Sequence, residues 1–171
     1  MEPHPDWPSY HFRAMGSAIG VWLDVDDEAG ARQAFATVEG LFAEVEAALS
    51  RFRPSNELCR LNSRPGEWVP VSRTLWKVLE RALDLAEMTG GLFDPTVLSA
   101  VRAAGYRDDF ETLHYTTRQP ADVLRGSWQT VRLDEGRRAV LLPDGIGLDF
   151  GGIGKGYTAA WAINLLDVWG P

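Results

Sequence analysis

Hydrophobic residues near the start of the chain follow two different periods. Alternating polar and apolar residues predict two strands, 10–15 and 18–25, which meet at Gly16-Ser17. After Asp26-Asp27, apolar residues recur every three or four positions, and this spacing predicts an amphipathic helix over about residues 28–50. Its buried face is predicted to carry Ala31, Phe35, Val38, Leu41, Phe42, Val45 and Leu49.

A second helical period begins after the turn at Pro65-Gly66. Ser72 is the predicted N-cap, because a serine hydroxyl can accept a hydrogen bond from the first helical turn. The helix is predicted to run to about residue 88, and Gly90-Gly91 ends it. Its apolar stripe is predicted to be Leu75, Leu79, Ala82, Leu83 and Ala86.

The last part of the chain predicts short elements. They are a short helix over 96–103 that starts at Pro95, a loop over 105–127, a hairpin of 129–133 and 139–142, a strand over 146–150 and a helix over 157–168. Mixed elements without an internal repeat predict one α+β domain, with helices packed on a largely antiparallel sheet. We expect this domain to cover residues 10–171, after a disordered tail of residues 1–9.

Charge and composition limit the classes of molecule that this protein is expected to bind. The formal net charge is −7 and the isoelectric point is about 4.9. This sign of field disfavours nucleic acid and anionic lipid as main partners. The sequence holds no run of about 18 apolar residues, so we expect no membrane insertion, and a cytoplasmic protein. A removed export signal stays open.

Cysteine and histidine offer little metal chemistry. Cys59 is the single cysteine, so the chain has no internal disulfide and no cysteine cluster. The histidines, His4, His11 and His114, are far apart in sequence, and no pair has the spacing of zinc ligands.

The stretch from Asp149 to Gly156 carries the most chemistry. It is predicted as a strand end, a glycine-rich turn and a helix start. Glycines let a ligand approach the backbone, and free N–H groups at a helix N-terminus attract phosphate. Lys155 adds a positive charge, and Asp149 can accept hydrogen bonds. The stretch matches neither a P-loop nor a dinucleotide fingerprint, so a plain strand-to-helix turn remains an equal interpretation.

Three further segments favour a ligand-binding role for this stretch over a plain turn. They are Met15-Gly16-Ser17, residues 49–62 and residues 90–97. Together with the glycine turn, in this order and at these separations, they resemble the ApbE family of FAD:protein FMN transferases. The resemblance extends from about residue 10 to 171, and no single motif decides it.

The resemblance implies a fold and an activity. The family fold is an α+β domain that binds FAD with magnesium. Its members transfer FMN from FAD to a threonine or serine hydroxyl of a target protein, often a membrane redox subunit, and release AMP. The positions that match FAD-contacting residues of the family are Met15, Phe52, Leu92, Phe93, Asp94, Asp149 and Lys155. Gly152 matches the residue whose backbone carbonyl binds magnesium; no catalytic residue is assigned.

Each of these positions has a structural alternative. Met15, Phe52 and Phe93 could be plain core residues, and Asp94 could cap the helix that starts near Pro95. Glu57 and Asn62 could fix the loop after the first long helix, and Cys59 has no assigned role.

Family members continue well past the position that matches Pro171, so the resemblance implies a fold that is truncated at its C-terminus. The further magnesium ligands and the proposed catalytic histidine belong to that later portion. A sheet that lacks later strands leaves an unpaired edge, which favours association between copies. Two other hypotheses stay open: a non-catalytic FAD-binding or interaction module, and an unrelated phosphate-binding domain.

Overall fold

The computed structural model describes residues 6–51, 55–104 and 127–167. The chain divides into two compact units. The first comprises residues 1–46 and 155–171, and the second comprises residues 47–154.

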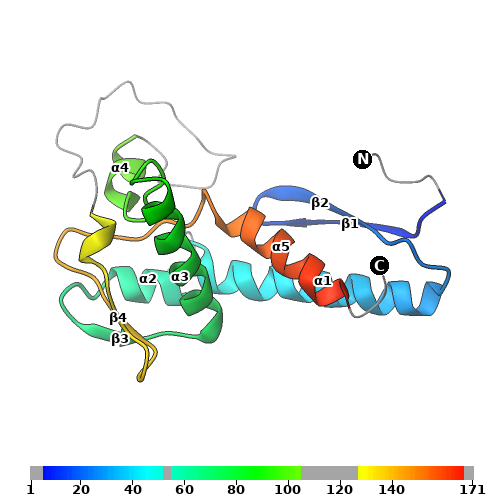
Figure 1. The fold of residues 1–171 in the computed structure, drawn as a ribbon, viewed down its shortest axis with the longest axis horizontal. Coiled ribbons are helices and arrows are strands. Elements are labelled where there is room, and N and C mark those ends of the chain that lie inside the picture. The colour runs from blue at the N-terminus through cyan, green and yellow to red at the C-terminus, as the bar shows by residue number, and fades with distance from the viewer. Residues whose placement is uncertain (1–5, 52–54, 105–126, 168–171) are drawn as a thin grey trace. The chain divides into compact units, whose positions relative to one another are not determined.

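The first unit contains an antiparallel hairpin beside a long helix (Figure 1). Strands β1 (Ser9–Ala14) and β2 (Ser17–Trp22) pair in register, with Tyr10 opposite Val21. The two-residue turn is Met15-Gly16, whose φ angles are 52° and 69°. Positive φ at both positions is typical of the tight turns that suit the twist of a hairpin. The turn therefore lies one residue earlier than the sequence predicted.

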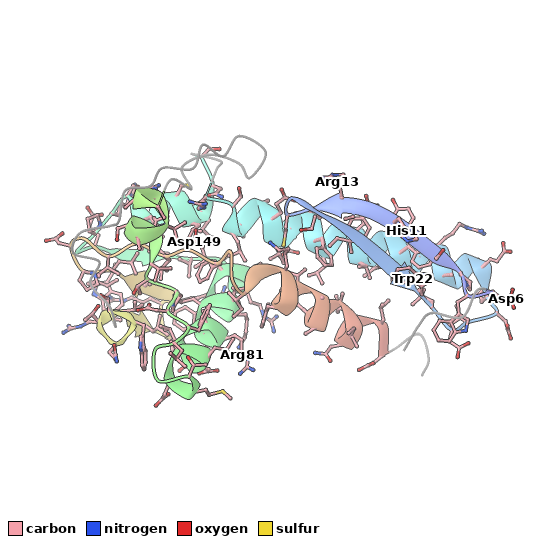
Figure 2. The ribbon with its side chains drawn as sticks, turned by 90° about the horizontal axis from the view of Figure 1, so that it is seen from above. Asp6, His11, Arg13, Trp22, Arg81 and Asp149 are labelled. Carbon is pink, nitrogen blue, oxygen red and sulfur yellow. The ribbon has the colours of Figure 1, made fainter. Side chains whose placement is uncertain are left out.

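One face of the hairpin packs on helix α1 (Glu28–Leu49). The Tyr10 ring stacks on Phe35 with centroids 5.6 Å apart, and its hydroxyl donates to Glu39 at 2.8 Å. The Phe12 ring meets the Phe42 ring edge-on, with centroids 5.5 Å apart. Asp27 begins the helix by accepting the Ala29 N–H at 3.0 Å. The opposite face of the hairpin is exposed and carries His11, Arg13 and Trp22, which Figure 2 labels.

The second unit contains a small sheet and helices. Its sheet has the order β3–β5–β4 and is antiparallel throughout, from Trp68–Pro70, Ala139–Leu141 and Arg132–Asp134. Its helices are α2 (Glu57–Asn62), α3 (Arg73–Met88), α4 (Leu98–Ala103) and the 3-10 helix η2 (Trp128–Thr130). The core side chains exposed by no more than 2 % include Leu58, Leu61, Val69, Leu75, Val78, Leu79, Val140, Leu142 and Leu148.

Helix α3 begins and ends as the sequence predicts. The Ser72 hydroxyl accepts the Leu75 N–H at 3.2 Å, and Gly90 and Gly91 after the helix have φ angles of 60° and 83°. Gly91 N–H donates back to the Ala86 carbonyl at 2.8 Å. The two long helices and the antiparallel pairing are confirmed, and so is the α+β class. Leu41, Phe42, Val45 and Leu79 are buried as predicted.

Leu83 is only half-buried, although it was predicted to be buried. Several predicted boundaries are also wrong. Strand β2 ends at Trp22 instead of Val25, and helix α4 begins at Leu98 instead of Thr96. The last helix, α5, is Gly154–Leu166, so it begins three residues earlier than predicted and includes part of the glycine turn. The predicted loop falls outside the described residues except for Ser127, as do residues 1–5 of the predicted tail.

Residues 146–150 do not form the predicted strand. Among the described residues, one isolated parallel bridge, Val97 to Gly147, pairs them with another segment. The physical reason is that a side chain and a loop carbonyl, described below, satisfy backbone groups that a sheet partner would otherwise satisfy.

Among the described residues, no helix is both long enough and apolar enough to cross a membrane.

Candidate functional site

The glycine turn is organised around Asp149, which Figure 2 labels. Its Oδ2 lies 3.1 Å from Nε of Arg51, and its Oδ1 accepts the Gly151 N–H at 2.9 Å. The two side chains of the ion pair are only 14 % and 10 % exposed. Removing either partner would leave the other charge poorly solvated, so the pair fixes the start of the turn.

The residue before Asp149 is held by Asn62, the last residue of α2. The Asn62 Oδ1 accepts the Leu148 N–H at 2.8 Å, and its Nδ2 donates to the Leu148 carbonyl at 2.9 Å. Leu148 is fully buried, so both backbone groups need partners within the protein. A single carboxamide supplies them as a neighbouring strand would.

A second segment runs parallel to this one. The Asp149 N–H donates to the Pro95 carbonyl at 2.9 Å, and the Leu98 N–H donates to the Gly147 carbonyl at 3.2 Å. These two bonds bring residues 93–96 beside the glycine turn. Of the predicted site residues, Phe93, Asp94, Asp149 and Gly152 therefore come together in the second unit.

Asp94 forms a local turn instead of capping a helix. Its Oδ1 accepts the Thr96 N–H at 2.8 Å and the Thr96 hydroxyl at 2.5 Å. Helix α4 begins two residues later, with Val97 in the cap position and no side-chain cap bond. If Asp94 has only a structural role, that role is to form this turn and not to cap a helix.

Gly152 lies against the edge of the Phe93 ring. A Cβ placed on Gly152 would be 3.3 Å from the nearest ring carbon, closer than ordinary van der Waals contact. Glycine therefore leaves room for the half-buried Phe93 ring at this point of the turn. The turn then closes on Phe150, whose carbonyl accepts the N–H groups of Ile153 and Gly154 at 3.1 and 2.7 Å.

The other predicted site residues lie elsewhere. Met15 belongs to the first unit, where its N–H donates to Glu46 at 3.0 Å. Lys155 is exposed in the first turn of α5 and is also assigned to the first unit. Leu92 lies in the second unit and is 95 % exposed. Phe52 lies outside the described residues.

Sequence reasoning missed two residues that shape the turn. Arg51 carried no signal, because its partner Asp149 is remote in the chain. Asn62 was noted only as structural, and its pairing with Leu148 could not be read from spacing.

Cys59 lies near the same loop. Its Sγ is 3.4 Å from the Arg51 carbonyl oxygen and 3.9 Å from the Ser50 carbonyl oxygen. Burial raises the pKa of the Cys59 thiol, and the charge of Arg102 opposes part of that shift.

The described residues do not complete a magnesium site. Mg²⁺ prefers about six oxygen ligands in near-octahedral geometry. The predicted contribution is the Gly152 carbonyl, and the described part of the chain holds no group of three His, Cys, Asp or Glu residues that could bind a metal. Magnesium binding therefore stays a prediction.

Comparison with known proteins assigns the family. The model of the ApbE family matches residues 15–170. A curated relative, the FAD:protein FMN transferase of Treponema pallidum (strain Nichols), is 32% identical over 145 residues, which cover 74% of this chain and 37% of the relative.

Solved structures show the same fold. The ApbE protein of Thermotoga maritima superposes with a TM-score of 0.79 at 22% identity, covering 95% of this chain and 53% of that one. The apo flavinyl transferase ApbE of Pseudomonas stutzeri also gives 0.79, at 21% identity, covering 96% and 53%. The chain thus spans about half of these structures and a smaller share of the curated relative. With most of its residues matched by the family model, the chain belongs to the ApbE family.

Proposed function

We propose that this chain supplies the FAD-binding part of a flavin transferase, which moves FMN from FAD to a threonine or serine hydroxyl of a target protein. The hydroxyl oxygen would form a bond to the phosphorus of the FMN half, and the bond from that phosphorus to the oxygen of AMP would break. The hydroxyl proton would pass to a base that we do not assign. AMP is then the leaving group.

The observation that carries the proposal is the assembly around Asp149. Arg51, Asn62 and Pro95 hold the turn from outside, so the backbone after Asp149 is preorganised instead of mobile. The turn leads directly into α5, a helix of 13 residues. The N-terminal N–H groups of such a helix attract phosphate, and Lys155 in its first turn adds charge of the right sign.

Magnesium dependence is part of this proposal. Its support is the family resemblance, and its ligands would need oxygen donors besides the Gly152 carbonyl. A target protein such as a membrane redox subunit, association between copies and a cytoplasmic location remain expectations of the same kind.

The alternative is an FAD-binding module without transfer activity. The transfer arm of the experiment below distinguishes it from an enzyme.

The experiment has two arms. Calorimetry with FAD, FMN and riboflavin tests binding, and we expect FAD to bind most tightly because the site also reads the pyrophosphate and adenosine. Equal affinity for FMN and FAD would contradict the site. Covalent flavin on a threonine-containing target, seen by in-gel fluorescence with AMP release, tests transfer with and without a magnesium chelator. Binding without transfer would favour the module.

A further inference from the structure

The indole N–H of Trp128, in η2, has no hydrogen-bond partner among the described residues although its Nε1 is fully enclosed. An indole nitrogen can only donate, so it cannot be satisfied by a neighbouring N–H group. A buried donor without an acceptor costs free energy, and such groups are rare in folded proteins. An orphaned donor therefore calls for an acceptor that binds from outside.

The neighbour of this N–H is the turn that follows helix α3. A Cβ placed on Gly91 would lie 3.5 Å from Nε1 of Trp128, in ordinary van der Waals contact with that nitrogen. Gly91 has a φ of 83°, a conformation that side chains rarely adopt. The absence of a side chain at Gly91 leaves space beside the donor.

The same turn leads into the predicted FAD segment. Leu92 follows Gly91 and is 95 % exposed, so no packing covers this side of the turn. Phe93 comes next and packs against Gly152 of the glycine turn. Trp128 is therefore placed next to the segment that leads to the Asp149 assembly.

We propose that Trp128 binds the flavin nucleotide by donating its indole N–H to an oxygen of that ligand. This inference rests on the proposed function and adds a specific donor to its site. The acceptor is either a flavin carbonyl or a phosphate oxygen, both of which accept from a neutral N–H. Because the partner is the ligand, the N–H contributes nothing to the stability of the ligand-free chain.

Trp76 in α3 provides a matched control. It is 6 % exposed. The pKa of Glu80 is lowered by Lys77, raised in part by burial, and lowered again by the Trp76 indole, which therefore faces the Glu80 carboxylate. Trp76 thus faces an acceptor within the protein, whereas Trp128 has none among the described residues.

The test replaces each tryptophan in turn with β-(3-benzothienyl)alanine, which keeps the shape of the ring and removes the N–H. At Trp128 we expect an unchanged or higher melting temperature without ligand, and FAD affinity about 2- to 12-fold weaker, the range for one hydrogen bond. At Trp76 we expect a lower melting temperature and unchanged FAD affinity. Titrations with riboflavin and with ADP locate the acceptor: the weakening persists with riboflavin if the acceptor is a flavin carbonyl, and with ADP if it is a phosphate oxygen.

Three results would overturn the inference, and they are distinguishable. If FAD binds the Trp128 variant as tightly as the unmodified chain, the inference fails while the proposed function stands. If the ligand-free Trp128 variant melts as early as the Trp76 variant, the N–H already has a protein partner. If the unmodified chain binds no FAD, FMN or ADP, the proposed function and this inference fail together.

Discussion

Asn62 and Leu148 are 86 positions apart in sequence, yet one side chain of the first satisfies both backbone groups of the second. The two bonds, at 2.9 and 2.8 Å, replace the backbone hydrogen bonds that a neighbouring strand would otherwise form with this buried residue. Asp149 follows directly, so the position of its carboxylate depends on a carboxamide at the end of α2.

The first prediction concerns this carboxamide. Asn62→Ala should lower the free energy of unfolding by about 1–3 kcal/mol, because it leaves buried backbone groups without partners. Urea unfolding measures the change. Asn164→Ala, at an exposed position of α5, is the control and should change stability by no more than about 0.5 kcal/mol. Equal effects of the two substitutions would contradict the role of Asn62.

Substitutions of Arg51 and Asp149, which form an ion pair, should be strongly coupled in their effects on stability. Arg51→Ala should destabilise the chain by about 2–4 kcal/mol, because it leaves a poorly solvated carboxylate. The double variant with Asp149→Ala should lose less than the sum of the single variants, by about 1–3 kcal/mol. Chemical denaturation of the four proteins measures this difference.

The control for that cycle is the exposed pair of Arg32 and Glu28, whose side chains are 71% and 84% exposed. Their coupling should be near zero, since solvent screens an exposed pair. A coupling between Arg51 and Asp149 as small as this would show that their contact is not energetically important.

A side chain at position 152 should clash with the Phe93 ring, and a second substitution should relieve the clash. Gly152→Ala should cost about 1–2 kcal/mol, because its Cβ presses on the Phe93 ring. Adding Phe93→Leu should recover part of that loss, since leucine can move away. Thermal unfolding measures both. Gly156→Ala, where an added Cβ would meet nothing within 4 Å beyond its chain neighbours and its own helix backbone, should be neutral or stabilising by up to about 1 kcal/mol.

The two lysines of the chain make a matched pair for FAD binding. Lys155→Ala should weaken FAD affinity by about 1–3 kcal/mol, the range for a lost charge-assisted hydrogen bond. Lys77→Ala should leave FAD affinity unchanged, because Lys77 pairs with Glu80 at 2.9 Å on α3. Calorimetry at several salt concentrations checks this, and equal losses would indicate a general charge effect.

The Cys59 thiol should react slowly with disulfide reagents in the folded chain. A raised pKa leaves less thiolate at a given pH, so at pH 8 the thiol should react with a disulfide reagent more slowly than glutathione does. Urea should remove the difference by exposing the thiol. Because the chain has one cysteine, the absorbance of the released thiolate reports on Cys59 alone. A reaction as fast as that of glutathione in the folded chain would contradict its burial.

The helices could be predicted from sequence because their causes are local. Apolar residues every three or four positions define α1 and α3, and the Ser72 hydroxyl acts within one turn of its own helix. The hairpin of β1 and β2 was predicted from the alternation of polar and apolar residues, but its turn is Met15-Gly16, one residue earlier than predicted. Even the motifs around Asp94 and Asp149 were visible as short runs of residues.

The arrangement of the candidate site was decided only by tertiary structure. Residues 146–150 have the composition of a strand, but their partners are the Asn62 side chain and the Pro95 carbonyl. Nothing local in Arg51 indicates that it pairs with Asp149, nor does anything local in Trp128 indicate that its N–H finds no acceptor in the described part of the chain. The sequence determined the two long helices, because periodicity and caps act over a few residues. The fold decided which groups meet in the glycine turn, because these buried polar groups need partners that only the folded chain brings near.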